Sequence, residues 1–220
     1  MDDRAPNRPS ALVLAAGEAP ETPPHLDHIG YVVAADGGLE HARRYGIGVD
    51  AVVGDLDSAD PAHLAGAVAQ GAAVERHPVD KDATDWELAL RHVRDAGYHR
   101  VVVVGGGGGR LDHFISNALV LASPDFSDLD LVWHVGSAAV RIGHPGTTTT
   151  VTGEPGDFVS LLAVGGSASG VTTEGLRWAL DRASLASGTS RGVSNELVKA
   201  TATVSLAAGA LLVIHERKDR

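Results

Sequence analysis

The sequence predicts an α/β domain with a doubly wound parallel sheet, followed by a β-sandwich domain. In the first half, short apolar runs alternate with helical patterns, and Gly or Asp follows most of these runs, which is typical of βαβ units. Beyond residue 127 the helical spacing fades, and short runs rich in Val, Thr and Gly are separated by turns. We therefore expect the two domains at residues 1–127 and 128–220.

Five short apolar runs are the expected strands of the α/β domain. Each has the length of a buried strand and is bounded by turn-forming or charged residues. They lie at residues 11–16, 29–35, 51–53, 72–74 and 101–104.

Helical patterns fall between these runs. Pro61 suits the first turn of a helix, with Asp60 before it as N-cap. Thr84 and Glu87 have the spacing of a capping box. Two sets of apolar residues at helical spacing then predict two buried helical faces. They are Trp86, Ala89, Leu90 and Val93 in one helix, and Leu111, Phe114, Ile115, Ala118, Leu119 and Ala122 in the other.

The second half contains only short runs with turns between them. Their spacing is that of strands in a two-sheet sandwich. The expected strands are residues 129–135, 138–142, 148–151, 158–164, 176–180, 200–206 and 211–214.

Three acidic segments follow apolar runs in the α/β half. They are residues 54–58 (GDLDS), 80–85 (DKDATD) and 108–113 (GGRLDH). Ligands of doubly wound sheets bind outside the carboxyl ends of the strands, where all three segments would lie. Carboxylates gathered in one place need a positive partner, and Mg²⁺ is commonly held by carboxylates together with substrate phosphates. The segments therefore predict a site for Mg²⁺ and a polyphosphate.

Each acidic segment also has a purely structural interpretation. In an extended chain Asp55 and Asp57 would point to the same side and could bind one ion, but an Asx-type turn would use the same residues. Asp82 and Asp85 flank a helix start, where a carboxylate favours the helix dipole. The recurrence of acidic segments after three strands favours the metal site.

The glycine run at residues 105–109 does not match a standard nucleotide motif. Arg110 stands where a dinucleotide fingerprint needs Gly, and Arg110-Leu111 stands where a Walker A loop needs Lys and then Ser or Thr. Glycines that open a helix still offer free N–H groups to phosphate, and Arg110 is a bidentate donor. A flexible tight turn is the alternative interpretation.

Composition excludes several classes of function. The net charge of −10 argues against a nucleic-acid backbone as partner. The absence of Cys excludes disulfides, thiolate catalysis and Cys-ligated zinc. No signal peptide is evident, and no apolar run approaches the roughly 20 residues of a membrane span. We expect a cytoplasmic protein with no membrane partner.

The motifs together resemble the thiamine pyrophosphokinase family. In the first half the resemblance rests on residues 36–38 (DGG), 54–58, 81–85 and 108–113 in this order. In the second half it rests on residues 175–180 (GLRWAL) and 188–196 (GTSRGVSNE). It covers the chain from about residue 11 to residue 214, and motifs in both halves make it specific.

The resemblance implies transfer of a pyrophosphoryl group from ATP to the hydroxyl of thiamine, which gives thiamine diphosphate and AMP. It also implies an N-terminal catalytic domain, a C-terminal domain that binds thiamine, and a homodimer with the thiamine pockets at its interface. Mg²⁺ would be the cofactor and ATP the co-substrate.

The resemblance also implies roles for single residues. Asp36, Asp55, Asp57 and Asp85 would bind Mg²⁺, with Asp82 a weaker candidate, and the catalytic set would be Asp55, Asp57, Lys81 and Asp85. Asp57 or Asp85 could accept the proton of the hydroxyl, and the sequence does not decide between them. ATP and its phosphates would contact Asp36, Gly37, Lys81, Thr84, Gly109, Arg110 and Asp112. Thiamine would contact Trp178, Ser194 and Asn195.

Two other functions stay open at this point. A pyrophosphokinase acting on another alcohol, such as a hydroxymethylpterin, would need the acidic segments but not the segment around Trp178. A non-catalytic sensor of nucleotide or thiamine diphosphate is the second, although the intact set of Asp and Lys residues argues against it.

Overall fold

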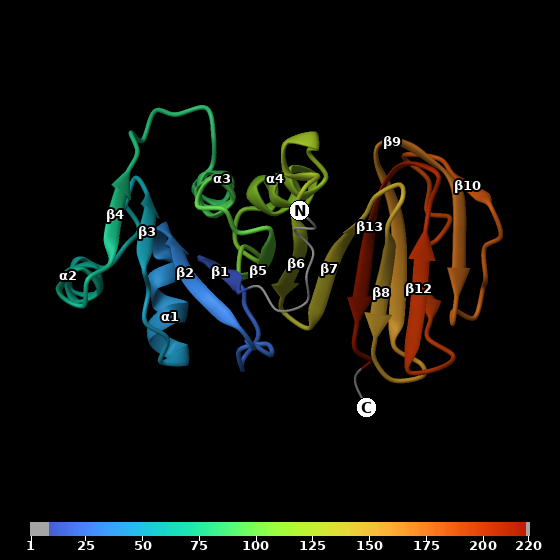
Figure 1. Cartoon of the computed structure of the whole chain (residues 1–220), viewed down its shortest axis with the longest axis horizontal. Helices are drawn as coiled ribbons and strands as arrows, with labels where there is room; N and C mark the ends of the chain where they lie inside the picture. Colours follow the sequence, from blue (N-terminus) through green and yellow to red (C-terminus); the bar gives the residue numbers. More distant parts are fainter. Residues whose placement is uncertain (1–8, 219–220) are drawn as a thin grey trace. The chain divides into compact units, whose positions relative to one another are not determined.

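Six parallel strands form the sheet of the N-terminal part in the order β4-β3-β2-β1-β5-β6 (Figure 1). The computed structural model describes residues 9–218. The strands are β1 (Ser10–Ala15), β2 (Ile29–Ala35), β3 (Ala51–Gly54), β4 (Ala73–Arg76), β5 (Arg100–Val104) and β6 (Asp130–Val135). The direction of strand succession reverses between β1 and β5, so a topological switch point lies there.

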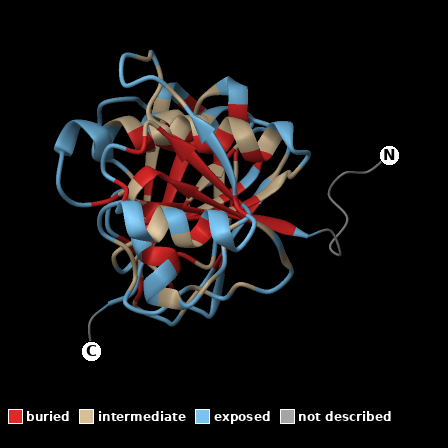
Figure 2. Ribbon diagram, turned by 90° about the vertical axis from the view of Figure 1, so that its left-hand side faces the viewer, coloured by how far each residue is buried: buried red, intermediate tan, exposed pale blue. Residues whose placement is uncertain are grey.

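Helices cover both faces of this sheet. α1 (Leu39–Tyr45) packs on β1 and β2, and α3 (Asp85–Asp95) packs on β1, β2 and β3 from the other face (Figure 1). Figure 2 shows buried strands between helices whose outer sides are exposed. The remaining helices are α2 (Pro61–Ala69), α4 (Leu111–Leu121) and the short 3₁₀ turns η1 (Asp36–Gly38) and η2 (Pro124–Phe126). Within residues 9–218, none of the helices has the length and apolar character needed to cross a bilayer.

Two expected helix starts are confirmed by their caps. Asp60 accepts hydrogen bonds from the backbone N–H groups of Ala62 and His63, and Pro61 occupies the first turn of α2. At α3, the Thr84 hydroxyl accepts from the N–H of Glu87 at 3.3 Å. The predicted apolar face of α3 is buried along its whole length. Local sequence was therefore sufficient to place both helices.

The predicted burial of the α4 face is wrong. Leu111, Ile115 and Leu119 are 69%, 49% and 55% exposed. Asn117 is buried instead, and its side-chain amide donates to the carbonyl of Gly106 at 3.1 Å. Asn117 therefore lies on the inward side of the helix, and much of the predicted apolar face is exposed.

The C-terminal part is built from antiparallel strands around β9 (Phe158–Glu174). The first half of β9 pairs with β13 (Ala208–Glu216), which also pairs with β7 (Ala138–Gly143). The second half pairs with β12 (Thr201–Ser205), which also pairs with β8 (Thr148–Thr152). Short strands β10 (Ala183–Leu185) and β11 (Asn195–Glu196) pair with β9 as well. The halves of this long strand therefore belong to different ladders, as expected of a sandwich.

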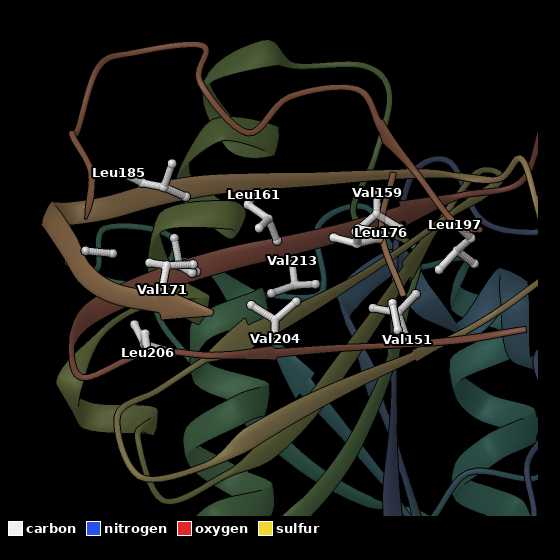
Figure 3. Close-up of a cluster of buried hydrophobic side chains, with 13 residues drawn as sticks. Val151, Val159, Leu161, Val171, Leu176, Leu185, Leu197, Val204, Leu206 and Val213 are labelled. Carbon is white, nitrogen blue, oxygen red and sulfur yellow. The ribbon is translucent and has the colours of Figure 1, made fainter. Parts of the chain in front are cut away.

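Gly165 and Gly166 let β9 pass from one ladder to the other. Their φ angles are +68° and +149°, which side chains rarely adopt, and strand glycines often mark such bends. Buried Val and Leu side chains lie between the ladders (Figure 3). They include Val151, Val159, Leu161, Val171, Leu197, Val204 and Val213. The predicted β-sandwich is confirmed.

One expected strand belongs elsewhere. The sequence pattern predicts residues 129–135 as a sandwich strand, but β6 pairs in parallel with β5 as the sixth strand of the first sheet. Periodicity alone cannot distinguish a buried parallel strand from a sandwich strand. In the structure the N-terminal unit extends to Asn117 and includes Asp128–Gly136. The second unit comprises Ala118–Ser127 and the chain from Ser137 onward.

Candidate active site

Three carboxylates meet at the carboxyl edge of the parallel sheet. Asp36 directly follows β2, Asp55 directly follows β3, and Asp85 is the first residue of α3. One oxygen from each lies within 4.8 Å of the others. We call Asp36, Asp55 and Asp85 the carboxylate triad. The strand-end pattern of the sequence brings together three of the four aspartates expected to bind metal.

Asp36 is the most buried member of the triad. It is 9% exposed, and its Oδ1 is buried without a hydrogen-bond partner among the described residues. Burial raises the pKa of Asp36, and the charges of Asp85 and Asp55 act in the same direction, against hydrogen bonds from Gly37 and Ser58. An orphaned carboxylate oxygen at such a position is well suited to a cation.

Gly54 keeps the space inside the triad open. Its φ is +146°, and a Cβ there would lie 2.9 Å from Asp85 Oδ1 and 3.2 Å from the Asp36 Cβ. Any other residue would be strained in its backbone and would press on two of the three carboxyl side chains.

Lys81 is the cation of the site in this structure. Its Nζ lies 2.6 Å from Asp55 Oδ2 and 3.1 Å from Asp85 Oδ1, and its side chain is 13% exposed. The hydrogen bond from Lys81 is the main cause that lowers the pKa of Asp55. Burial opposes the charge of Lys81, but the hydrogen bonds to Asp55 and Asp85 outweigh it and raise the pKa of the ammonium.

Asp57 lies outside the triad. The backbone N–H of Asp57 donates to Asp55 Oδ1 at 3.2 Å, which is the Asx-type turn that the sequence left open. Leu56 between them has a φ of +65° and a buried side chain, so the chain is not extended here and the two carboxylates do not point to the same side. Asp57 is exposed and accepts from the Ser58 hydroxyl at 2.9 Å. Asp82 is likewise exposed.

The glycine loop at residues 105–109 is fixed at the switch point. The N–H of Gly106 donates to the carbonyl of Ala16 at 2.7 Å, and the N–H of Glu18 donates to the carbonyl of Gly107 at 2.6 Å. A Cβ on Gly105 would lie 2.0 Å from the Ala15 carbonyl oxygen, so this position must be glycine. Hydrogen bonds and close packing therefore hold the first half of the loop against residues 15–18.

Residues that sequence reasoning did not single out support this loop. Trp133 Nε1 donates to the carbonyl of Gly105 at 2.6 Å. His41 contacts the segment 16–18 that hydrogen-bonds to the loop. Its Nε2 lies 2.8 Å from the carbonyl oxygen of Gly17, and burial lowers the pKa of His41. The only signal in the sequence was the position of Gly17 after the first strand, where doubly wound folds place ligand loops.

Arg110 and Asp112 bind each other. Two hydrogen bonds of 2.6 and 3.2 Å join the guanidinium to the carboxylate, and the side chains are 71% and 65% exposed. The Arg110 hydrogen bond is the main cause that lowers the pKa of Asp112 to about 2. Gly109 before them has a φ of +62°. The pair lies at the start of α4, accessible to a solute.

In the C-terminal part, Asn195 holds Trp178 by its backbone. The N–H of Trp178 donates to Asn195 Oδ1 at 3.0 Å, and Asn195 Nδ2 donates to the carbonyl of Trp178 at 2.8 Å. Asn195 is 5% exposed, whereas the Trp178 side chain is 55% exposed, so Trp178 is not a core residue. Arg177 Cζ lies 4.9 Å from the centre of the indole. Ser194 has a φ of +59°, and its N–H donates to Ser160 Oγ at 3.0 Å.

Two family models match the chain. The first is described as the catalytic domain of thiamin pyrophosphokinase and matches residues 24–133. The second is described as the vitamin B1 binding domain of thiamin pyrophosphokinase and matches residues 148–211. The carboxylate triad, Lys81 and the glycine loop lie within the first match, and Trp178, Ser194 and Asn195 lie within the second.

Individual proteins agree with these matches. Thiamine pyrophosphokinase of Bacillus subtilis (strain 168) is 24% identical over 73% of this chain and 75% of its own. The crystal structure of thiamine pyrophosphokinase from Bacillus subtilis has a TM-score of 0.81 at 22% identity and covers 96% of this chain and 100% of that one. The structure of a thiamin pyrophosphokinase family protein from Enterococcus faecalis has the same TM-score at 23% identity, with the same coverage. At such identities the solved structures show the fold, and the family models show the family. The chain belongs to the thiamin pyrophosphokinase family and has both of its domains, catalytic and vitamin B1 binding.

Proposed function

We propose that this chain is a thiamine diphosphokinase that transfers the pyrophosphoryl group of ATP to thiamine and releases AMP. The observation that carries the proposal is the triad of Asp36, Asp55 and Asp85 with Lys81 beside it, within the part that matches the family's catalytic domain. An exposed tryptophan in the part that matches the vitamin B1 binding domain supports thiamine as the acceptor.

The triad fits Mg²⁺ by three criteria. Its donors are all carboxylate oxygens, which Mg²⁺ prefers. Asp36 Oδ1 is buried without a protein partner among residues 9–218. Gly54 leaves open the space that a side chain would fill. Asp36, Asp55 and Asp85 would hold the ion, with Asp57 a further candidate from the neighbouring turn. When bound, the ion neutralises negative charge on the phosphates of ATP.

The remaining cationic and N–H donors would orient ATP. Lys81 lies beside the triad and would contact the transferred phosphates, and Arg110 would exchange Asp112 for a phosphate. Gly37 and Gly109 would offer backbone N–H groups at the ends of β2 and of the glycine loop. Thr84 lies at the start of α3, where its hydroxyl oxygen accepts from the N–H of Glu87. The hydrogen of this hydroxyl would be donated to a phosphate at the helix N-terminus.

The thiamine cation would stack on the indole of Trp178, which attracts cations by its electron-rich face. Asn195 in β11 fixes the backbone that carries the indole, and Ser194 directly precedes Asn195 in the chain. Asn195 therefore acts on thiamine through the placement of Trp178.

The reaction forms a bond between the thiamine hydroxyl oxygen and the β-phosphorus of ATP. The bond from that phosphorus to the oxygen bridging the α- and β-phosphates breaks, and the oxygen leaves with AMP. Asp57 or Asp85 would accept the hydroxyl proton. Lys81 and Arg110 would stabilise charge on the transferring oxygens, and fixed positions of the two substrates supply much of the remaining acceleration.

Three further predictions remain: a homodimer with thiamine pockets at its interface, a cytoplasmic location, and a domain boundary at residue 127. Sedimentation of the purified chain would test the homodimer. Limited proteolysis with mass analysis of the fragments would test the domain boundary.

Product analysis tests the proposed reaction. The protein is incubated with Mg²⁺, ATP and thiamine, and nucleotides and thiamine esters are separated by chromatography. We expect AMP and thiamine diphosphate in equal amounts. ADP as the main nucleotide, or AMP only when a pterin alcohol replaces thiamine, would refute the proposal.

A further inference from the structure

Lys81 stands where a divalent cation would have to bind. Its ammonium contacts Asp55 Oδ2 and Asp85 Oδ1, which are oxygens of two of the three triad side chains. The Lys81 and Asp55 side chains are 13% and 11% exposed, so the ion pair is shielded from water on most sides. The third member, Asp36, keeps its Oδ1 buried without a hydrogen-bond partner among the described residues. The site therefore holds one cation in contact with two carboxylates, and Asp85 Oδ1, like Asp36 Oδ1, lacks a well-formed hydrogen bond among the described residues.

These contacts would compete with a bound Mg²⁺. Mg²⁺ demands near-ideal octahedral geometry with oxygens at about 2.0–2.1 Å. An ammonium hydrogen-bonded to the same oxygens would then lie next to a divalent ion inside a poorly hydrated site, where repulsion between like charges is strong. Lys81 precedes the cap of α3, and its flexible four-carbon stem can move the ammonium while the backbone stays in place.

We propose that Lys81 is a built-in counter-cation, which neutralises the triad when no metal is bound and must leave these carboxylates before a divalent ion can bind. Metal loading then frees the ammonium for the phosphates of the substrate. Only this last step rests on the proposed function, because competition between Lys81 and metal needs neither ATP nor thiamine.

Competition has a measurable consequence for metal affinity. If the triad is occupied by Lys81 most of the time, the apparent dissociation constant of the metal is raised by the inverse of the free fraction. Removal of the ammonium should therefore tighten the binding of metal alone, although it removes a residue next to the site. If Lys81 merely positions the carboxylates, its removal should weaken metal binding, because the carboxylates would then be held less firmly.

The test is a titration with Mn²⁺ alone, followed by electron paramagnetic resonance of the free ion. Mn²⁺ suits the same carboxylate and water ligands as Mg²⁺. Wild type is compared with Lys81→Met and Lys81→Arg. The matched control is Arg76→Met, because Arg76 Nη1 donates at 3.3 Å to the backbone carbonyl of Asp55 and not to a carboxylate of the triad. This control measures the effect of removing a nearby positive charge without removing a competitor.

We expect Lys81→Met to bind Mn²⁺ roughly 10-fold more tightly than wild type. Arg76→Met should change the affinity by only about 2-fold, because its charge is exposed and screened. Lys81→Arg should stay close to wild type. Equal or weaker binding by Lys81→Met, or tightening no larger than that of Arg76→Met, would overturn the proposal.

A second uncharged variant controls for a folding defect in Lys81→Met. Lys81→Gln keeps a hydrogen-bond donor for Asp55 and Asp85 but carries no charge, and it should show the same direction of change as Lys81→Met. Circular dichroism reports whether each variant is folded before titration. A protein that bound Mn²⁺ as expected but made no AMP would refute the proposed function and leave the competition intact.

Discussion

Asp36 shows how the surroundings of one residue can indicate a ligand. Its left-handed φ of +47° and its position after β2 turn the carboxylate inward, and burial with neighbouring charges raises its pKa. Such a group destabilises the folded protein at neutral pH, because it must stay ionised in a poorly hydrated place beside like charges. A fold retains such a residue at a cost in stability, which points to function rather than packing.

Substitution of the triad separates function from stability. Asp55→Asn and Asp85→Asn should lower the rate of AMP formation by about 10²–10³-fold, because charge stabilisation at the phosphates is lost. Asp36→Asn should lower the rate similarly and raise the melting temperature of the metal-free protein, because a buried charge and its repulsion with Asp55 and Asp85 are removed. Steady-state kinetics and thermal unfolding measure both effects.

Asp82→Asn is the matched control for these variants. It removes the same charge from an exposed aspartate outside the triad and should keep near-normal turnover. Asp57→Asn should behave like the triad variants if Asp57 is a ligand or the base. If the turnover of Asp57→Asn equals that of Asp82→Asn, Asp57 is neither a ligand nor the base and serves only in the turn.

Trp178 offers a test of thiamine recognition at the residue scale. Stacking and cation–π attraction on an indole contribute about 0.5–2 kcal/mol, so Trp178→Ala should raise the KM for thiamine about 2- to 30-fold. The KM for ATP should not change, and Trp178→Phe should recover part of the loss. An unchanged KM for thiamine in Trp178→Ala would show that the exposed indole does not bind the substrate.

At the scale of elements, local sequence predicted well wherever a cap or a helical period fixed the structure. α2 and α3 begin at the expected Asp60 and Thr84 because the caps satisfy free backbone N–H groups. The sequence pattern predicts β6 in the wrong sheet, because its apolar run suits a parallel sheet and a sandwich equally well. The inward side of α4 carries Asn117, whose contact with the glycine loop is long-range and therefore absent from any local pattern.

A hydrogen-bond cluster around Asp157 joins two elements of the sandwich. Asp157, which is 3% exposed, precedes β9 and accepts hydrogen bonds from the N–H groups of Glu154 at 3.0 Å and Lys218 at 3.3 Å. It also lies 3.0 Å from His215 Nε2 on β13. Burial opposes the ionised carboxylate, but these hydrogen bonds outweigh it and lower the pKa of Asp157 below its ordinary 3.8. The charged form therefore stabilises the folded sandwich.

This cluster predicts a pH-dependent stability. Because the pKa of Asp157 is lower in the folded than in the unfolded chain, its contribution is complete above the unfolded value and is lost as pH falls through the folded value. Asp157→Asn should lower the free energy of unfolding at pH 7 by about 1.5–3 kcal/mol, the range for hydrogen bonds to charged groups. Urea unfolding measures the difference in the free energy of unfolding between wild type and Asp157→Asn, which should be smaller at pH 3 than at pH 7. An equal difference at the two pH values would contradict a stabilising role for the charged form of Asp157.

At the scale of the whole molecule, each part of the chain carries the groups proposed for one substrate. The strand-end pattern predicts that the segments containing Asp55 and Asp85 meet at one edge of the sheet, whereas Asp36 enters the expected ligand set only through the resemblance. The sequence placed Trp178 and Asn195 by resemblance, but not the two hydrogen bonds through which Asn195 holds the backbone of Trp178. The pairing of Lys81 with Asp55 and Asp85, and the support of the glycine loop by residues 16–18, depend on side-chain and loop geometry that spacing does not specify.

Positional labelling of ATP distinguishes attack of thiamine at the β-phosphorus from attack at the γ-phosphorus. The protein is incubated with thiamine, Mg²⁺ and ATP that carries ³²P only at the β-phosphate. We expect the label to leave the nucleotide and appear in thiamine diphosphate, with unlabelled AMP. Label that remains in ADP, with thiamine monophosphate as the ester, would mean attack at the γ-phosphorus and would refute the proposed reaction.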